Sequence, residues 1–312
     1  MYYRNISDLN QIILKRLHII PRDFDLIVGI PRSGMMPANL LAFYLNKPYT
    51  DIHSFINGHI YKAGARGQFF DIKDFKKVLV VDDSIASGSA IIKAKESLKE
   101  LTSDFDISYC AIYVMPGKEK MVNYHFEVVP LPRYFQWNIL NHTTLEKACF
   151  DIDGVLCIDP TEEQNDDGPK YIDFILNAPP LFVPGCKIGT IVTSRLEKYR
   201  KETISWLEKN NIKYRDLVML DLPDKRARQK ANNHAAHKAK TYNSSNEYVL
   251  FVESSLSQAI EINRLTKKPV FCTENFEMIF EAQSLSYNIK SGKYFPFLRR
   301  IALKLRNKLR NR

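Results

Sequence analysis

Two short acidic motifs, each directly after an apolar run, constrain the fold of this chain more than any other feature. Residues 78–84 read VLVVDDS and residues 149–154 read CFDIDG. An apolar run that leads into acids, small residues and then a helical pattern is typical of a buried parallel strand in an α/β protein. Since each motif opens its own series of strand and helix patterns, the sequence predicts two α/β domains.

Strand and helix patterns alternate along nearly the whole chain. The expected strands are residues 25–30, 78–82, 108–114, 148–152, 188–193, 217–220 and 248–252. The expected helices are residues 7–18, 35–45, 88–101, 170–177, 196–210, 224–241 and 256–265. This alternation favours two doubly wound, largely parallel sheets. We place the domains at residues 1–135 and 148–284, with a linker at 136–147 and a tail at 285–312.

Composition narrows the class of protein. The five cysteines lack CxxC spacing, which favours reduced thiols in a cytoplasmic protein. The net charge is +10, but nine basic residues lie from Lys290 onward and no acid follows Glu281. The rest of the chain is therefore close to neutral, and binding to nucleic acid is not expected. No apolar run approaches the ~18 residues of a membrane span, and the N-terminus lacks a signal-peptide pattern.

The first motif indicates a site for a sugar phosphate. Asp82 and Asp83 end the expected strand, where adjacent carboxylates can accept hydrogen bonds from two neighbouring sugar hydroxyls. Small residues follow and open a helix, so that their backbone N–H groups form a site for an anion. These residues are Ala86, Ser87, Gly88 and Ser89.

The stretch VLVVDDSIASGSA, residues 78–90, resembles the motif that binds phosphoribosyl pyrophosphate (PRPP) in the type I phosphoribosyltransferases. A second stretch, VGIPRSGMMPANLLA at residues 28–42, resembles their pyrophosphate loop. The resemblance implies that Asp82 and Asp83 hold the ribose 2- and 3-hydroxyls and that residues 86–90 cradle the 5-phosphate. The residues that it implies for the pyrophosphate are Arg32, Ser33 and Gly34.

Two positions depart from the pattern of that family. Ala90 stands where the family usually has Thr, and Ala86 stands where its hypoxanthine-guanine branch often has an acid. Residues 53–68 lie where the family keeps a mobile loop, from which Lys62 or Arg66 would reach the pyrophosphate.

The second motif lies in ACFDIDGVLC, residues 148–157. Its two aspartates stand two apart after a strand, so alternation along the strand puts both carboxylates on the same side. The stretch resembles motif I of the haloacid dehalogenase superfamily. This resemblance implies that Asp151 is a nucleophile that forms an aspartyl-phosphate and that Asp153 is a general acid and base.

Later stretches resemble the remaining motifs of that superfamily. Thr193 in IVTSR would bind the transferring phosphoryl group, and Glu253 ends the last strand in FVESS. Lys238 would neutralise charge between the nucleophile and the phosphate, with Lys225 and Lys240 as rivals.

The resemblance also implies a Mg²⁺ site and an open active site. Asp151, the Asp153 carbonyl and Glu253 would supply the hard oxygen ligands that Mg²⁺ prefers. Ser254 and Ser255 stand where the superfamily usually has a second acid, which predicts weaker or water-mediated metal binding. The gaps between the motifs leave no room for a large extra domain. We therefore expect an uncapped haloacid dehalogenase-like site, which suits a phosphate carried on a large substrate.

The tail has a pattern of its own. In residues 295–312, Leu298, Ile301, Leu305 and Leu309 fall near one helical face, and Arg and Lys fill much of the remainder. This predicts a basic amphipathic helix that lies on an anionic membrane surface. A disordered basic tail, or one that attracts RNA, is the alternative.

The pairing of the two domains resembles the bifunctional enzymes that form ribofuranose in bacterial polysaccharide assembly. This implies transfer of 5-phosphoribosyl from PRPP to a glycan acceptor, lipid-linked and at the inner face of the cytoplasmic membrane, followed by removal of the 5-phosphate. One alternative is a nucleobase phosphoribosyltransferase fused to a nucleotide 5-phosphatase. Another is a domain that senses PRPP for regulation, fused to a phosphatase.

Overall fold

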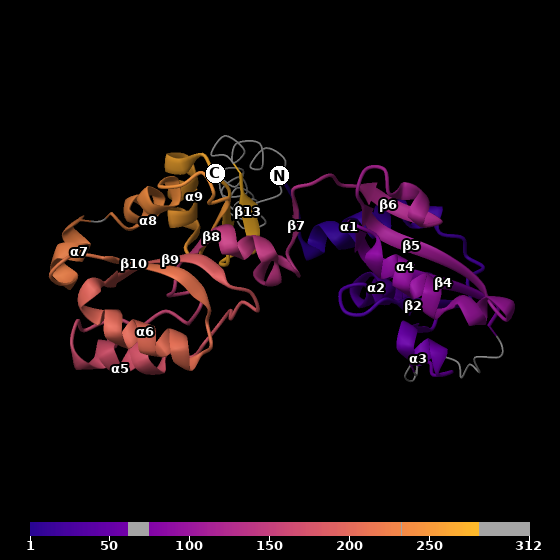
Figure 1. Cartoon of the computed structure of the whole chain (residues 1–312), viewed down its shortest axis with the longest axis horizontal. Coiled ribbons are helices and arrows are strands. Elements are labelled where there is room, and N and C mark those ends of the chain that lie inside the picture. The colour runs from indigo at the N-terminus through magenta and orange to yellow at the C-terminus, as the bar shows by residue number, and fades with distance from the viewer. Residues whose placement is uncertain (62–74, 232, 281–312) are drawn as a thin grey trace, which may run out of the picture. The chain divides into compact units, whose positions relative to one another are not determined.

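The computed structural model describes residues 1–61, 75–231 and 233–280, and these form two compact units (Figure 1). The units are Met1–Trp137 and Asn138–Arg312. Lys62 and Arg66, and the helix expected at residues 295–312, lie outside the described residues.

The first unit is built on a parallel sheet of five strands in the order β3-β2-β4-β5-β6. The strands are β2 (Leu26–Gly29), β3 (Tyr49–Asp51), β4 (Lys77–Ile85), β5 (Asp106–Val114) and β6 (Tyr124–Val128). The helices are α1 (Ile6–Arg16), α2 (Met35–Leu45), α3 (Ile52–Ile56) and α4 (Ser89–Ser97), with 3₁₀ turns η1 (Leu17–Ile19), η4 (Lys99–Ser103) and η5 (Glu119–Met121). A separate parallel pair joins β1 (Tyr2–Arg4) to β7 (Arg133–Phe135).

Strand β4 shows why this sheet is covered on both faces. Leu79 and Val81 pack with α1 and α2 in one core, whereas Val78 and Val80 pack with α3 and α4 in the other. Side chains alternate along a strand, so a continuous apolar run supplies both cores. This arrangement is the doubly wound fold that the sequence predicts.

The second unit contains a sheet of six strands in the order β10-β9-β8-β11-β12-β13, with only the last pair antiparallel. The strands are β8 (Ala148–Phe150), β9 (Ile188–Leu196), β10 (Tyr214–Leu220), β11 (Leu250–Glu253), β12 (Val270–Cys272) and β13 (Glu277–Ile279). The helices are α5 (Pro169–Asn177), α6 (Arg200–Lys209), α7 (Lys225–Ala231), α8 (His234–Asn243) and α9 (Leu256–Thr266), and η8 (Glu197–Tyr199) precedes α6. Helices α5 and α6 cover one face of the sheet, and α8 and α9 cover the other (Figure 1).

The structure differs from the sequence-based expectations at a predicted helix and at the predicted linker. The helix expected at residues 224–241 is two helices, α7 and α8. The segment expected as a linker, residues 136–147, instead carries the turns η6 (Ile139–Asn141) and η7 (Thr143–Lys147), and the chain divides between Trp137 and Asn138. Ile139 and Leu145 are each 1% exposed, so most of this segment folds into the second unit.

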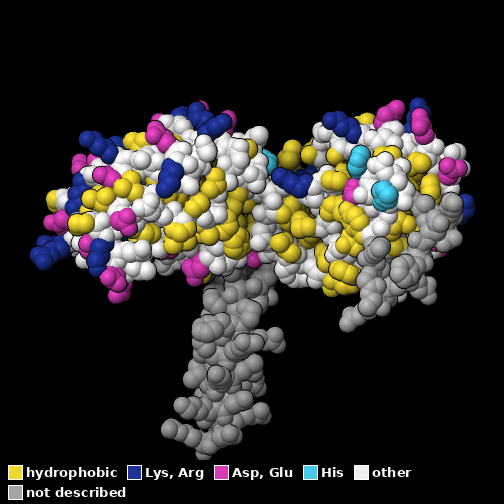
Figure 2. All heavy atoms as spheres, turned by 90° about the horizontal axis from the view of Figure 1, so that it is seen from below, with side chains coloured by type: hydrophobic (Ala, Val, Ile, Leu, Met, Phe, Trp, Pro, Cys, Tyr) yellow, Lys and Arg dark blue, Asp and Glu magenta, His cyan; other side chains and the backbone are white. Residues whose placement is uncertain are grey.

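The surface of the described residues has no single charged face in the view of Figure 2, where basic and acidic side chains are interspersed on each unit. This agrees with the near-neutral composition expected outside the tail. Among the described helices, none is long and apolar enough to cross a membrane.

Candidate active sites

The two stretches that resemble parts of a PRPP site meet at the carboxyl edge of the first sheet. Gly34 lies against β4, because a Cβ there would come within 2.5 Å of the Ile30 carbonyl oxygen and 2.8 Å of the Val81 carbonyl oxygen. Ser33 Oγ donates a hydrogen bond of 2.9 Å to Asp83 Oδ1. The loop therefore packs directly on the strand that carries the acidic pair, and Arg32 is exposed beside it.

The two residues of the acidic pair have different surroundings in this structure. Strand β4 stays paired in register with β5 as far as Ile85, so Asp82 and Asp83 point to opposite faces. Asp83 Oδ2 accepts a hydrogen bond of 2.7 Å from Trp137 Nε1, which leaves Asp82 to face the neighbouring cavity. Burial raises the pKa of Asp82 to about 8, and the charge of Asp83 adds to this shift.

The expected phosphate cradle is a cavity of about 180 Å³ at the start of α4. Its lining is Asp82 together with residues 84–91, which include all four cradle residues expected from the sequence. Gly88 has φ of +92°, and a Cβ there would come within 2.1 Å of Met121 Cε, so this position requires glycine. The small residues leave space of phosphate size over a helix N-terminus, which favours an anion.

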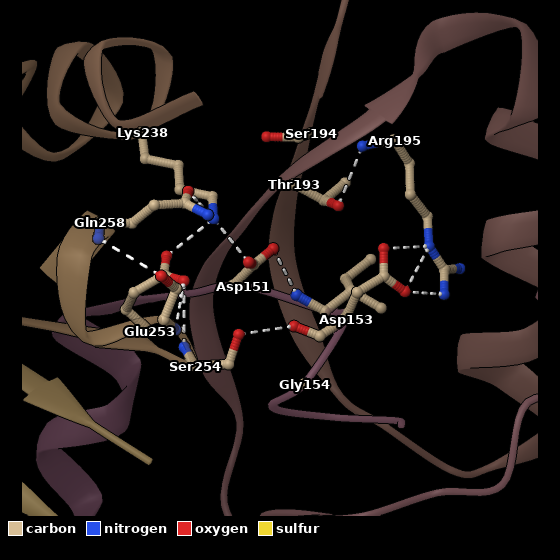
Figure 3. Close-up of polar contacts among 12 residues, drawn as sticks. Asp151, Asp153, Gly154, Thr193, Ser194, Arg195, Lys238, Glu253, Ser254 and Gln258 are labelled. Carbon is tan, nitrogen blue, oxygen red and sulfur yellow. Dashed lines mark hydrogen bonds and ion pairs between the residues drawn. The ribbon is translucent and has the colours of Figure 1, made fainter. Parts of the chain in front are cut away.

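The second unit contains a cavity of about 620 Å³ at the carboxyl edge of its own sheet. Asp151 and Asp153 follow β8, Lys238 comes from α8, and Gln258 comes from α9 (Figure 3). The lining is Asp151, Asp153, Gly154, Asp159, Leu181, Phe182, Ser194, His234, Lys238, Ser254, Ser255, Gln258, Thr273, Glu274 and Phe276.

Lys238 is the lysine that meets the expected nucleophile. Its Nζ lies 2.6 Å from Asp151 Oδ2 and 2.7 Å from Glu253 Oε2, and its side chain is almost wholly buried. Lys225 instead donates to the Asn165 carbonyl, and Lys240 is exposed. Burial raises the pKa of Asp151 to about 7, with Lys238 opposing the shift.

Glu253, one of the expected Mg²⁺ ligands, contacts Lys238 and two backbone amides in this structure. Glu253 is 0% exposed, and its Oε1 accepts hydrogen bonds of 3.0 Å from both Ser254 N and Ser255 N. Its Oε2 faces Lys238, and the Asp153 carbonyl accepts a hydrogen bond of 3.1 Å from Ser254 Oγ. Among the described residues, no group of three or more His, Cys, Asp and Glu side chains is placed to hold a metal ion. In this structure Glu253 fixes Lys238.

Thr193 does not line the cavity, whereas its neighbour Ser194 does. Thr193 is 0% exposed, and its Oγ1 accepts a hydrogen bond of 3.2 Å from Arg195 N. The Ser194 Oγ has no hydrogen-bond partner among the residues that the structure describes. Ser194 is therefore the residue of IVTSR that lines the cavity, and the sequence analysis did not choose it.

Comparisons with known proteins identify the first unit. Residues 2–141 match the family model of the phosphoribosyl transferase domain. The N-terminal part of this chain is a type I phosphoribosyltransferase domain. The match ends at residue 141, close to the start of the second unit.

Individual relatives match parts of the chain. The chain is 36% identical over 78 residues to the orotate phosphoribosyltransferase of Sulfolobus acidocaldarius, which is 25% of this chain and 38% of that protein. It is 32% identical over 103 residues to the transcriptional regulator GfcR of Methanocaldococcus jannaschii, which is 31% of this chain and 46% of that protein. The chain thus spans less than half the length of these relatives. A solved purine phosphoribosyltransferase from Pyrococcus horikoshii is 22% identical, with a TM-score of 0.31, over 44% of this chain and 92% of that one.

The phosphoribosyltransferase domain contains two further residues at its candidate site that the sequence analysis did not assign. Arg133 is buried, and its Nη2 donates a hydrogen bond of 2.7 Å to the carbonyl of Ile85, at the start of the cradle. Trp137 donates to Asp83, as described above. Both follow the last strand of the sheet in a stretch without strand or helix periodicity, so no pattern marked them.

Proposed function

We propose that this chain transfers 5-phosphoribosyl from PRPP to a glycan acceptor and then removes the 5-phosphate to leave ribofuranose. One observation carries the proposal: a single chain has an anion cradle beside Asp82 and, in its other unit, a cavity that presents Asp151 and Lys238. The first site suits a donor that is a sugar phosphate. The second suits a phosphate ester, which is what the first reaction would make.

In the transfer step, one bond to C1 of the ribose forms and another breaks. The acceptor hydroxyl oxygen attacks C1 of PRPP, the bond from C1 to the pyrophosphate oxygen breaks, and the acceptor proton leaves to solvent. PRPP enters with Mg²⁺ on its pyrophosphate, which offsets the charge on the leaving group. Backbone donors of the loop around Arg32, Ser33 and Gly34 hold that group, and the cradle holds the 5-phosphate.

The hydrolysis step uses the second unit. Asp153 first takes up a proton from solvent. The Asp151 carboxylate then attacks phosphorus, the bond from phosphorus to the ribose O5 breaks, and Asp153 gives its proton to that oxygen. Water then attacks the aspartyl-phosphate, Asp153 takes a proton from the water, and inorganic phosphate leaves. Lys238 stabilises the negative charge throughout, because its ammonium lies 2.6 Å from Asp151.

The form of the second cavity supports a large substrate. Between β8 and β9 the chain forms α5 and loops, all of it described, and no additional domain. The basic tail, which carries nine of the net positive charges, supports an acceptor attached to an anionic membrane.

A second candidate function is PRPP sensing without transfer. It is favoured by the match to GfcR, which is named as a transcriptional regulator. Sensing predicts that PRPP binds and no pyrophosphate is released. A third candidate, transfer to a nucleobase, is favoured by the match to an orotate phosphoribosyltransferase.

The test uses Asp151→Asn to stop the second step. The variant is incubated with PRPP, Mg²⁺ and either nucleobases or lipid-linked glycans, and pyrophosphate release and product mass are measured. We expect a glycan that gains one phosphoribosyl group, and the wild-type chain should then remove the phosphate. The matched control is Asp173→Asn, an exposed carboxylate on α5, which should behave as wild type. Turnover with a nucleobase alone would refute the glycan proposal, and binding without release would favour sensing.

A further inference from the structure

Arg195 is a fully buried arginine whose charge is directed at one residue of the second site. It lies near the end of β9, and its side chain is 0% exposed. Its Nη2 lies 2.6 Å from Asp153 Oδ1, and its Nε lies 3.1 Å and 3.2 Å from the two carboxylate oxygens (Figure 3). Two nitrogen atoms thus hold one carboxylate in a defined plane.

Asp153 is the one acid that pairs with this guanidinium among the described residues. Nη2 also contacts Cys157 Sγ at 3.3 Å, and the guanidinium lies over the Phe174 ring at 5.9 Å. A buried guanidinium is costly unless it is paired, so this environment holds the ion pair together. Arg195 thereby restrains the Asp153 carboxylate through both of its oxygen atoms, and the Asp153 side chain is 20% exposed and lines the cavity.

Each of the two aspartates of the second site has its own basic partner. Lys238 contacts Asp151, the expected nucleophile, whereas Arg195 contacts Asp153, the expected proton donor. No hydrogen bond or ion pair in the described residues joins the Arg195 side chain to Asp151. The loss of Arg195 should therefore disturb proton delivery more than nucleophilic attack.

We propose that Arg195 is a positioning residue that holds the Asp153 carboxyl where it can reach the leaving ester oxygen. This inference rests on the phosphatase step of the proposed function. It assigns to Arg195 the selectivity of the site for esters of alkyl alcohols, such as a ribose 5-phosphate.

The reason is the chemistry of the leaving group. An alkoxide leaves poorly unless a proton reaches it in the transition state, whereas p-nitrophenolate leaves without one. General acid catalysis contributes roughly 100-fold to 10,000-fold to such steps. A variant that misplaces Asp153 should thus lose the first reaction with alkyl phosphates and keep it with p-nitrophenyl phosphate.

The experiment compares Arg195→Met and Arg195→Lys in the full chain. Rapid mixing measures the first release of the alcohol from ribose 5-phosphate and of p-nitrophenol from p-nitrophenyl phosphate. For Arg195→Met we expect a loss of about 100-fold or more with ribose 5-phosphate and less than about 5-fold with p-nitrophenyl phosphate. Because Asp153 also serves the water attack, p-nitrophenol should appear as a burst followed by slow turnover. Arg195→Lys should restore part of the loss.

Arg264→Met is the matched control, since Arg264 forms an exposed ion pair with Glu261 and should react as wild type. Equal losses with both substrates in the first turnover, in variants with wild-type thermal unfolding, would overturn the assignment and leave the phosphatase function standing. If Arg195→Met does not fold, Arg195→Lys provides the same test. Its loss with ribose 5-phosphate should then exceed its loss with p-nitrophenyl phosphate, and equal losses would overturn the assignment. If the wild type releases neither product, the proposed hydrolysis fails, and this inference fails with it.

Discussion

At the scale of single residues, neighbouring side chains in IVTSR have different environments. Thr193 is 0% exposed and caps the Arg195 amide, while Ser194 lines the cavity with an uncommitted hydroxyl among the described residues. Alternation along β9 produces this difference, because successive side chains point to opposite sides. We therefore predict that the serine, and not the threonine, contacts the phosphoryl group.

Two separate substitutions, each of which removes one hydroxyl group, test this prediction. Ser194→Ala should raise KM for a phosphate ester, and the inhibition constant of inorganic phosphate, by roughly tenfold, since one hydrogen bond to a charged group is lost. The isosteric Thr193→Val should change KM little and lower the melting temperature, because a buried cap is lost. Steady-state kinetics and thermal unfolding measure both effects. The reverse pattern would return the phosphoryl contact to Thr193.

Asp82 makes the stability of the first unit depend on pH. Burial, and then the charge of Asp83, raise the pKa of Asp82 in the folded chain to about 8, from an unfolded value of about 3.9. Between about pH 4 and about pH 8 the folded state therefore holds a proton that the unfolded state lacks. Stability from this group falls as pH rises through that window and becomes constant above it.

The expected slope is up to about 1.4 kcal/mol per pH unit, and Asp82→Asn should remove it. Urea unfolding from about pH 5 to about pH 9, followed by the fluorescence of Trp137 in a Trp206→Phe background, reports on the first unit, since the chain has two tryptophans. Trp137 lies beside Asp83, so its emission follows the site itself. A slope that survives in Asp82→Asn would show that another group titrates.

At the scale of elements, the sequence predicts central strands and misses short ones. Strands β4, β5 and β9 are nine residues each and covered on both faces, so long apolar runs mark them. The strands that were missed include β1, β3, β7, β12 and β13, of three residues each. Three residues are too few for a period, and tertiary pairing determines such strands.

The residues of the candidate sites also differ in how far the sequence alone predicts them. Residues at the ends of long strands, such as Asp82 and Asp151, follow from the motif alone. The choice of Lys238 over Lys225 and Lys240 required the packing of α8 on β11, and so did the role of Glu253. One feature could have indicated Arg195. Strand β9 lies beside β8, so a residue near the end of β9 can meet a residue just after β8.

The turn into α4 depends on one glycine. Gly88 and Gly58 both have positive φ, +92° and +74°, but a Cβ at Gly58 would meet nothing within 4 Å. Gly88→Ala places its backbone strain inside the cradle, and its Cβ would also push the flexible end of Met121 aside, so the substitution should displace the cradle. We expect PRPP binding, measured by calorimetry, to weaken at least tenfold in Gly88→Ala. Gly58→Ala, the matched control, should bind nearly as wild type, and equal effects would refute the role of the cradle.

At the scale of the whole molecule, nearly all the net positive charge lies in the tail sequence, beyond the two described units. Residues 290–312 carry nine of the ten net positive charges, and basic and acidic side chains are interspersed on each unit in the view of Figure 2. Each Lys or Arg near an anionic membrane contributes about 1 kcal/mol at low salt. We therefore expect the tail to bind the membrane, mainly through the attraction of its basic residues to anionic lipids.

A chain that ends at residue 284 retains every described helix and strand and tests this point. The full chain should sediment with vesicles that contain about 30% phosphatidylserine and remain in solution with neutral vesicles. Salt at about 0.5 M should release it, because the Debye length then falls to a few ångströms. The shortened chain should remain in solution throughout, and its activity on p-nitrophenyl phosphate should equal that of the full chain, because the second cavity is lined by residues before 284. Equal sedimentation of both chains would place membrane binding in the folded units, and binding of the full chain to RNA but not to vesicles would favour the nucleic-acid reading of the tail.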